Sequence, residues 1–306
     1  MATLRHLRTD ADVALAARHV IGRSRSCQLQ IDAGEVSATH AEIAWDGRAW
    51  HLRDLGSRNG TFVAGQRIPP GKQVALDLGT EIGFGAPDSQ YRFVDDSAPR
   101  LIAFGPDQVR VAEDDMLCLP SPDEWEVMIF CDSDGRWVIE TVEGTRPLKD
   151  EECVVVGGRP YVVHLPGGVL ATRDVEALGE DALDRGVLEL LVSRDGEHVD
   201  VCLRSDVRVY PIESRAHVFL LLALARARLA DAGAAQLPES EHGWMYREEL
   251  MKELAIEDPQ LLNLWVFRAR QQLAQLKLRG ASKVVERREG TGQLRLGLRH
   301  VRVIDA

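Results

Sequence analysis

Apolar and polar residues alternate in short runs along the first 95 residues. The alternation is clear in residues 41–45, 50–52, 74–78 and 91–94, and the pair Asp46-Gly47 separates the first two runs. A period of two is typical of strands with one buried face, and an Asp-Gly pair between two such runs favours a hairpin. Many short strands at close spacing predict a β-sandwich, which we expect to end near the polar segment 95–99.

The strand pattern continues from residue 97 to residue 172. Residues 135–139 resemble residues 47–52, and residues 154–163 resemble the end of the first region. Two interpretations stay open for this segment, a shortened second copy of the first domain or an unrelated β-module. Residues 173–186 mix acidic and small side chains, which predicts a charged linker or a short helix.

The period changes in the last part of the chain, residues 187–306. Three strand patterns come first, and apolar residues then recur every three to four positions, as in helices. The expected elements are strands at 187–192, 199–203 and 207–210, helices at 214–231, 246–254 and 258–280, and a hairpin at 284–296. Ser214 and Asp258 are the expected N-caps, Pro259 the first position of the last helix, and Gly280 its end.

The last expected helix has two different faces. At 100° per residue, one buried face contains Leu262, Val266, Ala269, Leu273 and Leu276. The opposite side carries Arg268, Gln271 and Gln275, and Arg and Gln side chains suit the edges of guanine and adenine. Leu264 and Phe267 add apolar bulk to that side, which favours a protein interface instead.

Composition narrows the class of protein. The chain has 306 residues, of which 45% are apolar and 28% charged, as in a soluble protein of two or three domains. It has no run of about 18 apolar residues and begins with charged residues, so we expect no membrane helix, no signal peptide and a cytoplasmic location. The five cysteines and nine histidines are scattered, which predicts neither a disulfide framework nor a metal site.

Charge is distributed unevenly along the chain. The net charge is −1 for residues 1–96, −11 for residues 97–186 and +1 for residues 187–306, and it reaches +7 for residues 262–306. The acidic middle predicts a solvated face or a partner surface. The basic end is a surface that a polyanion can approach.

Three loops at the ends of the first strands share one kind of chemistry. They are Gly22-Arg23-Ser24, Ser37-Ala38-Thr39-His40 and Ser57-Arg58-Asn59-Gly60-Thr61. Each places a hydroxyl, guanidinium or amide donor beside a turn residue, which aims polar groups at a shared anion. A phosphothreonine carries about −1.5 to −2 charges and three acceptor oxygens. The loops together therefore predict a phosphopeptide receptor, although each alone is compatible with an ordinary turn.

This order of loops resembles the forkhead-associated (FHA) domain, a β-sandwich that binds phosphothreonine peptides. The resemblance covers about the first 95 residues and implies two sets of residues. The phosphopeptide contacts would be Arg23, Ser37, Ser57, Arg58 and Asn59. The residues that shape or brace the loops would be Gly22, His40 and Gly60. Ala38 departs from the family, because a second polar contact is common there, and this leaves peptide selectivity beyond phosphothreonine open.

The elements of residues 187–306 resemble the OmpR/PhoB-type winged helix-turn-helix. Residues 262–273 fit the recognition helix of that family in register. The resemblance implies DNA contacts from Arg268, Arg270 and Gln271 on this helix and from Arg287, Arg288 and Arg295 on the following hairpin, or wing. The segment 233–243 departs from the family by lengthening the link before the second helix.

The sequence thus predicts a multidomain protein, β and then α+β. The expected parts are an FHA β-sandwich at 1–96, a β-rich acidic module at 97–172, a linker at 173–186 and a winged helix at 187–306. The leading hypothesis is a transcriptional regulator that docks a threonine-phosphorylated protein, linked to a Ser/Thr kinase, and binds double-stranded DNA. The alternative is a phosphopeptide-dependent adaptor whose winged helix contacts protein. No nucleophile–base pair, nucleotide-binding loop or metal cluster is visible, so we expect no enzyme activity, cofactor or metal.

Overall fold

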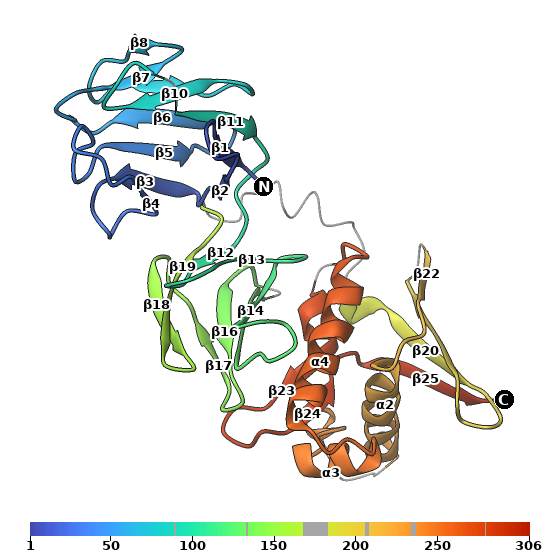
Figure 1. Cartoon of the computed structure of the whole chain (residues 1–306). Helices are drawn as coiled ribbons and strands as arrows, with labels where there is room; N and C mark the ends of the chain where they lie inside the picture. The colour runs from blue at the N-terminus through green and yellow to red at the C-terminus, as the bar shows by residue number, and fades with distance from the viewer. Residues whose placement is uncertain (89, 133, 168–182, 206–207, 234–236, 279) are drawn as a thin grey trace. The chain divides into compact units, whose positions relative to one another are not determined.

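The computed structural model describes residues 1–306 apart from residues 89, 133, 168–182, 206–207, 234–236 and 279. The chain divides into two compact units (Figure 1). Unit 1 contains Met1–Val111, Asp150–Val154 and Pro160–Val169, and unit 2 contains Ala112–Lys149, Val155–Arg159 and Leu170–Ala306. Both units therefore contain parts of the expected module at 97–172. Most of the expected linker at 173–186 lies outside the described residues.

Unit 1 is built on a β-sandwich of two mainly antiparallel sheets. The strands are β1 (Thr3–His6), β2 (Asp12–Ala14), β3 (Arg18–Gly22), β4 (Leu29–Gln30), β5 (Ala41–Trp45), β6 (Trp50–Asp54), β7 (Thr61–Val63), β8 (Gln66–Arg67), β9 (Gln73–Ala75), β10 (Glu81–Phe84) and β11 (Tyr91–Asp95). One sheet has the order β2-β1-β11-β10-β7-β8 and the other β4-β3-β5-β6-β9. The predicted sandwich is confirmed.

The sandwich forms because alternate side chains of its strands are apolar. In β6, residues 50, 52 and 54 are buried while residues 51 and 53 are only half-buried. Side chains from both sheets meet in one core, which includes Leu4, Ile21, Ile43, Leu52 and Phe93. The predicted hairpin joins β5 to β6, and the Asp46 carboxylate accepts the backbone N–H groups of Arg48 and Ala49 at 2.8 Å each.

A smaller sheet lies mostly in unit 1. Its strands are β12 (Ile102–Phe104), β13 (Val109–Val111), β18 (Glu152–Val156) and β19 (Arg159–His164), in the order β13-β12-β19-β18. The Phe104 ring links this sheet to the sandwich, because it lies edge-on to His19 of β3 at 5.8 Å and to His164 at 5.4 Å between ring centroids.

Unit 2 contains a four-stranded sheet and the C-terminal helices. The sheet has the strands β14 (Met116–Leu119), β15 (Val127–Cys131), β16 (Trp137–Glu140) and β17 (Thr145–Pro147) in sequence order. The C-terminal elements are η1 (Leu183–Arg185), β20 (Val187–Val192), β21 (Val199–Arg204), β22 (Val209–Ile212), α2 (Val218–Ala232), η2 (Glu239–Glu241), α3 (Arg247–Glu253), α4 (Pro259–Ala274), η3 (Ala281–Val284), β23 (Val285–Arg287), β24 (Leu294–Leu296) and β25 (His300–Asp305).

These C-terminal elements share one core. Strands β22, β21, β20 and β25 form one sheet in that order, and β23 pairs with β24 as a hairpin after α4. Buried leucines and valines of α2 and of the inner face of α4 pack with the sheet, among them Leu221, Leu262, Val266 and Leu273. The predicted inner face of α4 is confirmed at Leu262, Val266, Ala269 and Leu273, which are buried, whereas Leu276 lies beyond the end of the helix.

The predicted helix boundaries are partly wrong. Helix α4 begins as expected, since the Asp258 side chain accepts the Gln260 N–H at 2.9 Å. It ends at Ala274 rather than near Gly280, because Lys277 has a left-handed φ of 55° that a continuing helix cannot contain. Helix α2 begins at Val218 with His217 as its N-cap, so Ser214 does not cap it.

No helix in the described part of the chain is both long enough and apolar enough to cross a membrane.

Candidate functional site

The three predicted loops meet at one end of the sandwich. Strand β5 pairs antiparallel with both β3 and β6, and Ala41 lies opposite both Ile21 and Asp54. The end of β3, the start of β5 and the end of β6 therefore lie at the same end of the sheet. The loop residues 22–24, 37–40 and 57–60 extend from this end.

Ser37 connects the three loops. Its carbonyl oxygen accepts the Arg23 N–H at 2.9 Å from the first loop, and its Oγ accepts the Arg58 N–H at 3.1 Å from the third. The Asn59 side-chain amide also donates to the Glu35 carbonyl oxygen at 2.8 Å. A hydroxyl that accepts one hydrogen bond keeps its own hydrogen for an incoming acceptor.

His40 holds the second and third loops together from below. It is fully buried; its Nδ1 accepts the Ser37 N–H at 3.0 Å, and its Nε2 donates to the Gly60 carbonyl oxygen at 3.1 Å. Burial lowers the pKa of His40, although the Gly60 carbonyl acts in the opposite direction. The ring is therefore neutral, with its hydrogen on Nε2.

Two loop positions require glycine. A Cβ atom on Gly22 would lie 2.3 Å from the Ala38 carbonyl oxygen, so any side chain would separate the first two loops. Gly60 has a φ of 92°, and a Cβ there would lie 2.2 Å from Nε of Arg67. These are the sites where sequence analysis expected shaping glycines.

Asp54, which sequence analysis missed, organises the third loop. Its buried carboxylate accepts the Gly56 and Ser57 N–H groups at 2.9 Å each, the Ser57 hydroxyl at 2.5 Å and the Thr61 hydroxyl at 2.7 Å. Burial opposes its ionisation, but the Ser57 and Thr61 hydrogen bonds outweigh this and hold the pKa of Asp54 below its ordinary value. A buried anion therefore fixes the loop.

This arrangement corrects the role expected for Ser57. The residue is 6% exposed, its hydroxyl donates to Asp54, and its Oγ accepts the Gly60 N–H at 3.0 Å. Its one donor hydrogen is thus already used. Ser57 braces the loop and does not offer a donor to a phosphate.

Two exposed arginines add positive charge to this end of the sandwich. Arg23 and Arg58 lie on the first and third loops, and neither forms an ion pair with another residue that the structure describes. Guanidinium groups on two loops whose backbones hydrogen-bond to Ser37 suit an anion with several acceptor oxygens. Arg23, Ser37, Arg58 and Asn59 therefore lie together, as the sequence analysis expected.

The residues expected to contact DNA lie in different surroundings. Arg270 is 1% exposed, and its two terminal nitrogens donate to the two Glu140 oxygens at 3.0 and 2.9 Å. The Arg287 side chain is equally buried and donates from Nε to the same carboxylate at 3.3 Å. The prediction that these two side chains face solvent is wrong, because the β14–β17 sheet covers them.

The other expected DNA contacts are also engaged inside unit 2. Arg288 pairs with Glu241 at 2.9 Å and Arg295 with Glu286 at 2.7 Å, and both guanidinium groups lie over the Trp244 ring. Gln271 is buried, and its Nε2 donates to a Glu113 oxygen at 2.9 Å. Arg268 remains half-buried with the Gln271 side-chain oxygen at 3.2 Å.

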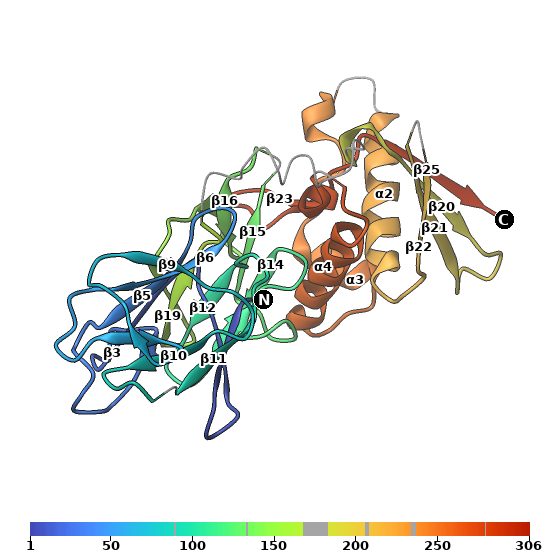
Figure 2. The ribbon, with the colours of Figure 1, turned by 90° about the horizontal axis from the view of Figure 1, so that it is seen from above.

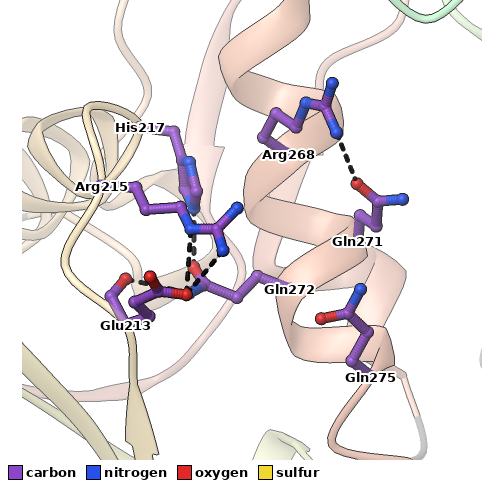
Figure 3. A pocket seen from close by; sticks show the side chains of 7 residues that line it. All are labelled: Glu213, Arg215, His217, Arg268, Gln271, Gln272 and Gln275. Atoms are coloured by element: carbon purple, nitrogen blue, oxygen red, sulfur yellow. Dashed lines mark hydrogen bonds and ion pairs between the residues drawn. The ribbon is translucent and has the colours of Figure 1, made fainter.

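A small cavity lies beside α4, between Arg268 and the segment before α2 (Figure 3). Its volume of about 40 Å³ leaves room for a water molecule or two, but not for an organic ligand. The Gln272 side chain closes one side by bridging His217 at 2.7 Å and the Glu213 carbonyl oxygen at 2.9 Å. Among the described residues, no three His, Cys, Asp or Glu side chains are grouped to hold a metal.

Comparisons with known proteins place the sandwich in a family. The family model described as FHA domain matches residues 19–85. A protein phosphatase 1 regulatory inhibitor subunit homologue from Arabidopsis thaliana is 35% identical over 71 residues, which are 22% of this chain and 19% of that protein. The FHA domain-containing protein FhaB of Mycobacterium tuberculosis is 30% identical over 76 residues, 24% of this chain and 49% of FhaB. The chain spans less than half the length of either relative.

One solved structure comes from a study of phosphothreonine-dependent FHA domain interactions. It is 28% identical, covers 31% of this chain and 95% of that chain, and has a TM-score of 0.28. The family match lies on β3 to β10 and includes all three loops. Residues 19–85 of this chain are therefore an FHA domain.

Proposed function

We propose that this chain is a signalling protein that binds phosphothreonine peptides through its FHA domain. The observation that carries the proposal is the group formed by Arg23, Ser37 and Arg58. Two guanidinium groups and a hydroxyl hydrogen that have no partner among the described residues lie at one end of the sandwich. A phosphothreonine brings about −1.5 to −2 charges and three acceptor oxygens to such a site.

The rigidity of the loops supports this function. His40 and Asp54 fix the second and third loops with buried hydrogen bonds before any ligand arrives. A receptor that is already ordered loses less conformational entropy on binding. Asn59 is exposed, and its amide, which donates to the Glu35 carbonyl oxygen, keeps an acceptor oxygen and a second hydrogen that suit a peptide backbone.

We further propose that residues 187–306 form a winged helix that binds DNA, so that phosphopeptide docking is linked to transcription. The order of β20–β22, α2, α3, α4 and the β23–β24 hairpin supports it, as does the net charge of +7 over residues 262–306. The adaptor alternative loses the support that Phe267 gave it in the sequence, because this side chain is buried against the chain's own β14–β17 sheet.

The phosphate site is tested by a matched pair of arginine variants. Arg23→Ala should lower the affinity for a phosphothreonine peptide library at least tenfold, because a charge-assisted hydrogen bond contributes about 1.5–3 kcal/mol. Arg48→Ala is the control, since Arg48 is exposed on the β5–β6 hairpin at the other end of β5.

Fluorescence polarisation with a labelled library measures both variants in the full chain. Equal affinities of Arg23→Ala and the unaltered protein would remove Arg23 from the site. A matching loss in Arg48→Ala would mean that general charge, rather than the three loops, attracts the peptide.

A further inference from the structure

The outward face of α4 is covered by the chain's own β14–β17 sheet. Both ribbon views show this sheet alongside α4 within unit 2 (Figures 1 and 2). Phe267 is 1% exposed and packs into an apolar cluster of the sheet, formed by Met116, Cys118, Trp125, Met128, Phe130 and Val138. The Trp125 indole N–H also donates to the Asn263 carbonyl oxygen at 2.9 Å. Apolar packing and this hydrogen bond thus hold the sheet on the helix.

The centre of this contact is an anion held by two arginines. Arg270 comes from α4 and Arg287 from the β23–β24 hairpin, and both bind the carboxylate of Glu140 at the end of β16. Arg270 also lies over the Phe130 ring at 5.0 Å and Arg287 over the Trp125 ring at 5.8 Å. A helix and a hairpin that each supply an arginine to one anion form a receptor of the kind that a backbone phosphate also fits.

Acidic side chains continue along the same face. Glu113 accepts the Gln271 amide at 2.9 Å, and Asp114 accepts the Gln275 amide at 3.2 Å. At the tip of the hairpin, the Gly290 N–H donates to the Glu143 carbonyl oxygen at 2.9 Å. The polar groups of α4 and the hairpin therefore meet oxygen acceptors of the sheet and of the segments that flank its strands, as they would meet a polyanion.

We propose that the β14–β17 sheet is an intramolecular mimic of nucleic acid that occupies the DNA-binding face of α4 and the hairpin. Duplex DNA then competes with Glu140, Glu113 and Asp114 for the same side chains. The C-terminal region binds DNA after the sheet leaves α4. This inference rests on the proposed DNA function and adds its regulation.

The central test weakens the contact at Glu140 in the full chain. Glu140→Gln removes the charge that holds Arg270 and Arg287 but keeps the size of the side chain. Glu126→Gln is the matched control, because Glu126 is exposed next to Trp125 and, among the described residues, forms no hydrogen bond or ion pair with α4. The probe is a labelled random-sequence DNA duplex, titrated at low and high salt, where electrostatic binding is strongest and weakest.

We expect Glu140→Gln to bind the duplex at least tenfold more tightly than the unaltered protein at low salt, and Glu126→Gln to bind like the unaltered protein. The gain should weaken as salt rises, and adding Arg268→Ala should reduce it. Amide hydrogen exchange over residues 259–274 gives an independent reading of whether the sheet has left α4. Exchange should be faster in Glu140→Gln and unchanged in Glu126→Gln.

Glu113→Gln/Asp114→Asn is the second variant if Glu140→Gln does not fold, since both residues are exposed. It should increase duplex affinity in the same direction. The proposal is overturned if the unaltered protein binds the duplex as tightly as a variant whose α4 exchanges faster. If α4 opens in the variants and no form binds DNA at low salt, the DNA function itself fails, and with it the role of the sheet as a mimic.

Discussion

Ser37 and Ser57 show how position decides what one side chain can do. Both lie on loops at the same end of the sandwich, and both accept a backbone N–H through Oγ. The Ser57 hydrogen is committed to Asp54, whereas no described acceptor takes the Ser37 hydrogen. The Ser57 hydroxyl therefore contributes to stability, whereas the Ser37 hydroxyl is available for ligand binding.

Alanine substitutions at the two serines should therefore give opposite results. Ser37→Ala should lower phosphopeptide affinity roughly tenfold with little change in thermal midpoint, because it loses a hydrogen bond to a charged ligand. Ser57→Ala should lower stability by about 1–3 kcal/mol, because it leaves Asp54 and the Gly60 N–H with one bond fewer in a buried place. Thermal unfolding and peptide polarisation measure the two effects, and the reverse pattern would contradict the assigned roles.

For single residues of the phosphate site, the sequence predicted the exposed polar groups better than the buried ones. Arg23, Ser37 and Arg58 could be predicted because charge and hydroxyl groups in turns indicate an anion site without knowledge of packing. Asp54 could not, because an aspartate at the end of a strand is equally well explained by a turn. Its hydrogen bonds exist only after residues 54–61 have folded around it.

Strand β3, which leads into the first loop, also contains a buried histidine, His19. His19 is fully buried; its Nδ1 accepts the Ala16 N–H at 3.2 Å, and its Nε2 has no hydrogen-bond partner in the described part of the chain. Burial, with a smaller contribution from His164, lowers the pKa of His19 to about 3. The folded protein therefore holds this ring neutral at pH values where the unfolded chain protonates it.

The sign of the pH effect follows from this lowered pKa. Because the unfolded state binds the proton more tightly, the stability that His19 permits is present above about pH 6.5 and is lost as pH falls toward about 3. At pH 5 the loss should be on the order of 2 kcal/mol. His19→Gln should flatten the change in the urea midpoint between pH 7.5 and pH 5, and an equal change in both proteins would contradict the account.

Helix α4 shows why an element is easier to predict than its surroundings. The 3.6-residue period and the Asp258-Pro259 start identified the helix and its inner face, because both are local properties of the chain. The partner of the outer face could not be identified, since Glu140 and Arg270 are 130 residues apart. Two features of the sequence indicated that the outer face of α4 has a partner. One was the apolar pair Leu264 and Phe267 on that face, and the other was the acidic charge of the middle segment.

At the scale of the whole molecule, two candidate sites belong to two different units. The phosphate site uses loops of unit 1 alone, and the covered α4 face is complete within unit 2. The order of strands and helices along the chain followed from its hydrophobic pattern. The division into units did not, because residues 102–104 and 160–164 complete unit 1 from within a segment that the sequence predicts as one module.

The proposed function requires that the loop end of the FHA domain recognise a phosphothreonine. The most direct measurement is a pair of polarisation titrations of the full chain, one with a labelled phosphothreonine peptide library and one with the same library unphosphorylated. We predict that the phosphorylated library binds at least tenfold more tightly, because the phosphate supplies the charge that Arg23, Ser37 and Arg58 are placed to receive. Equal binding of the two libraries would contradict the account.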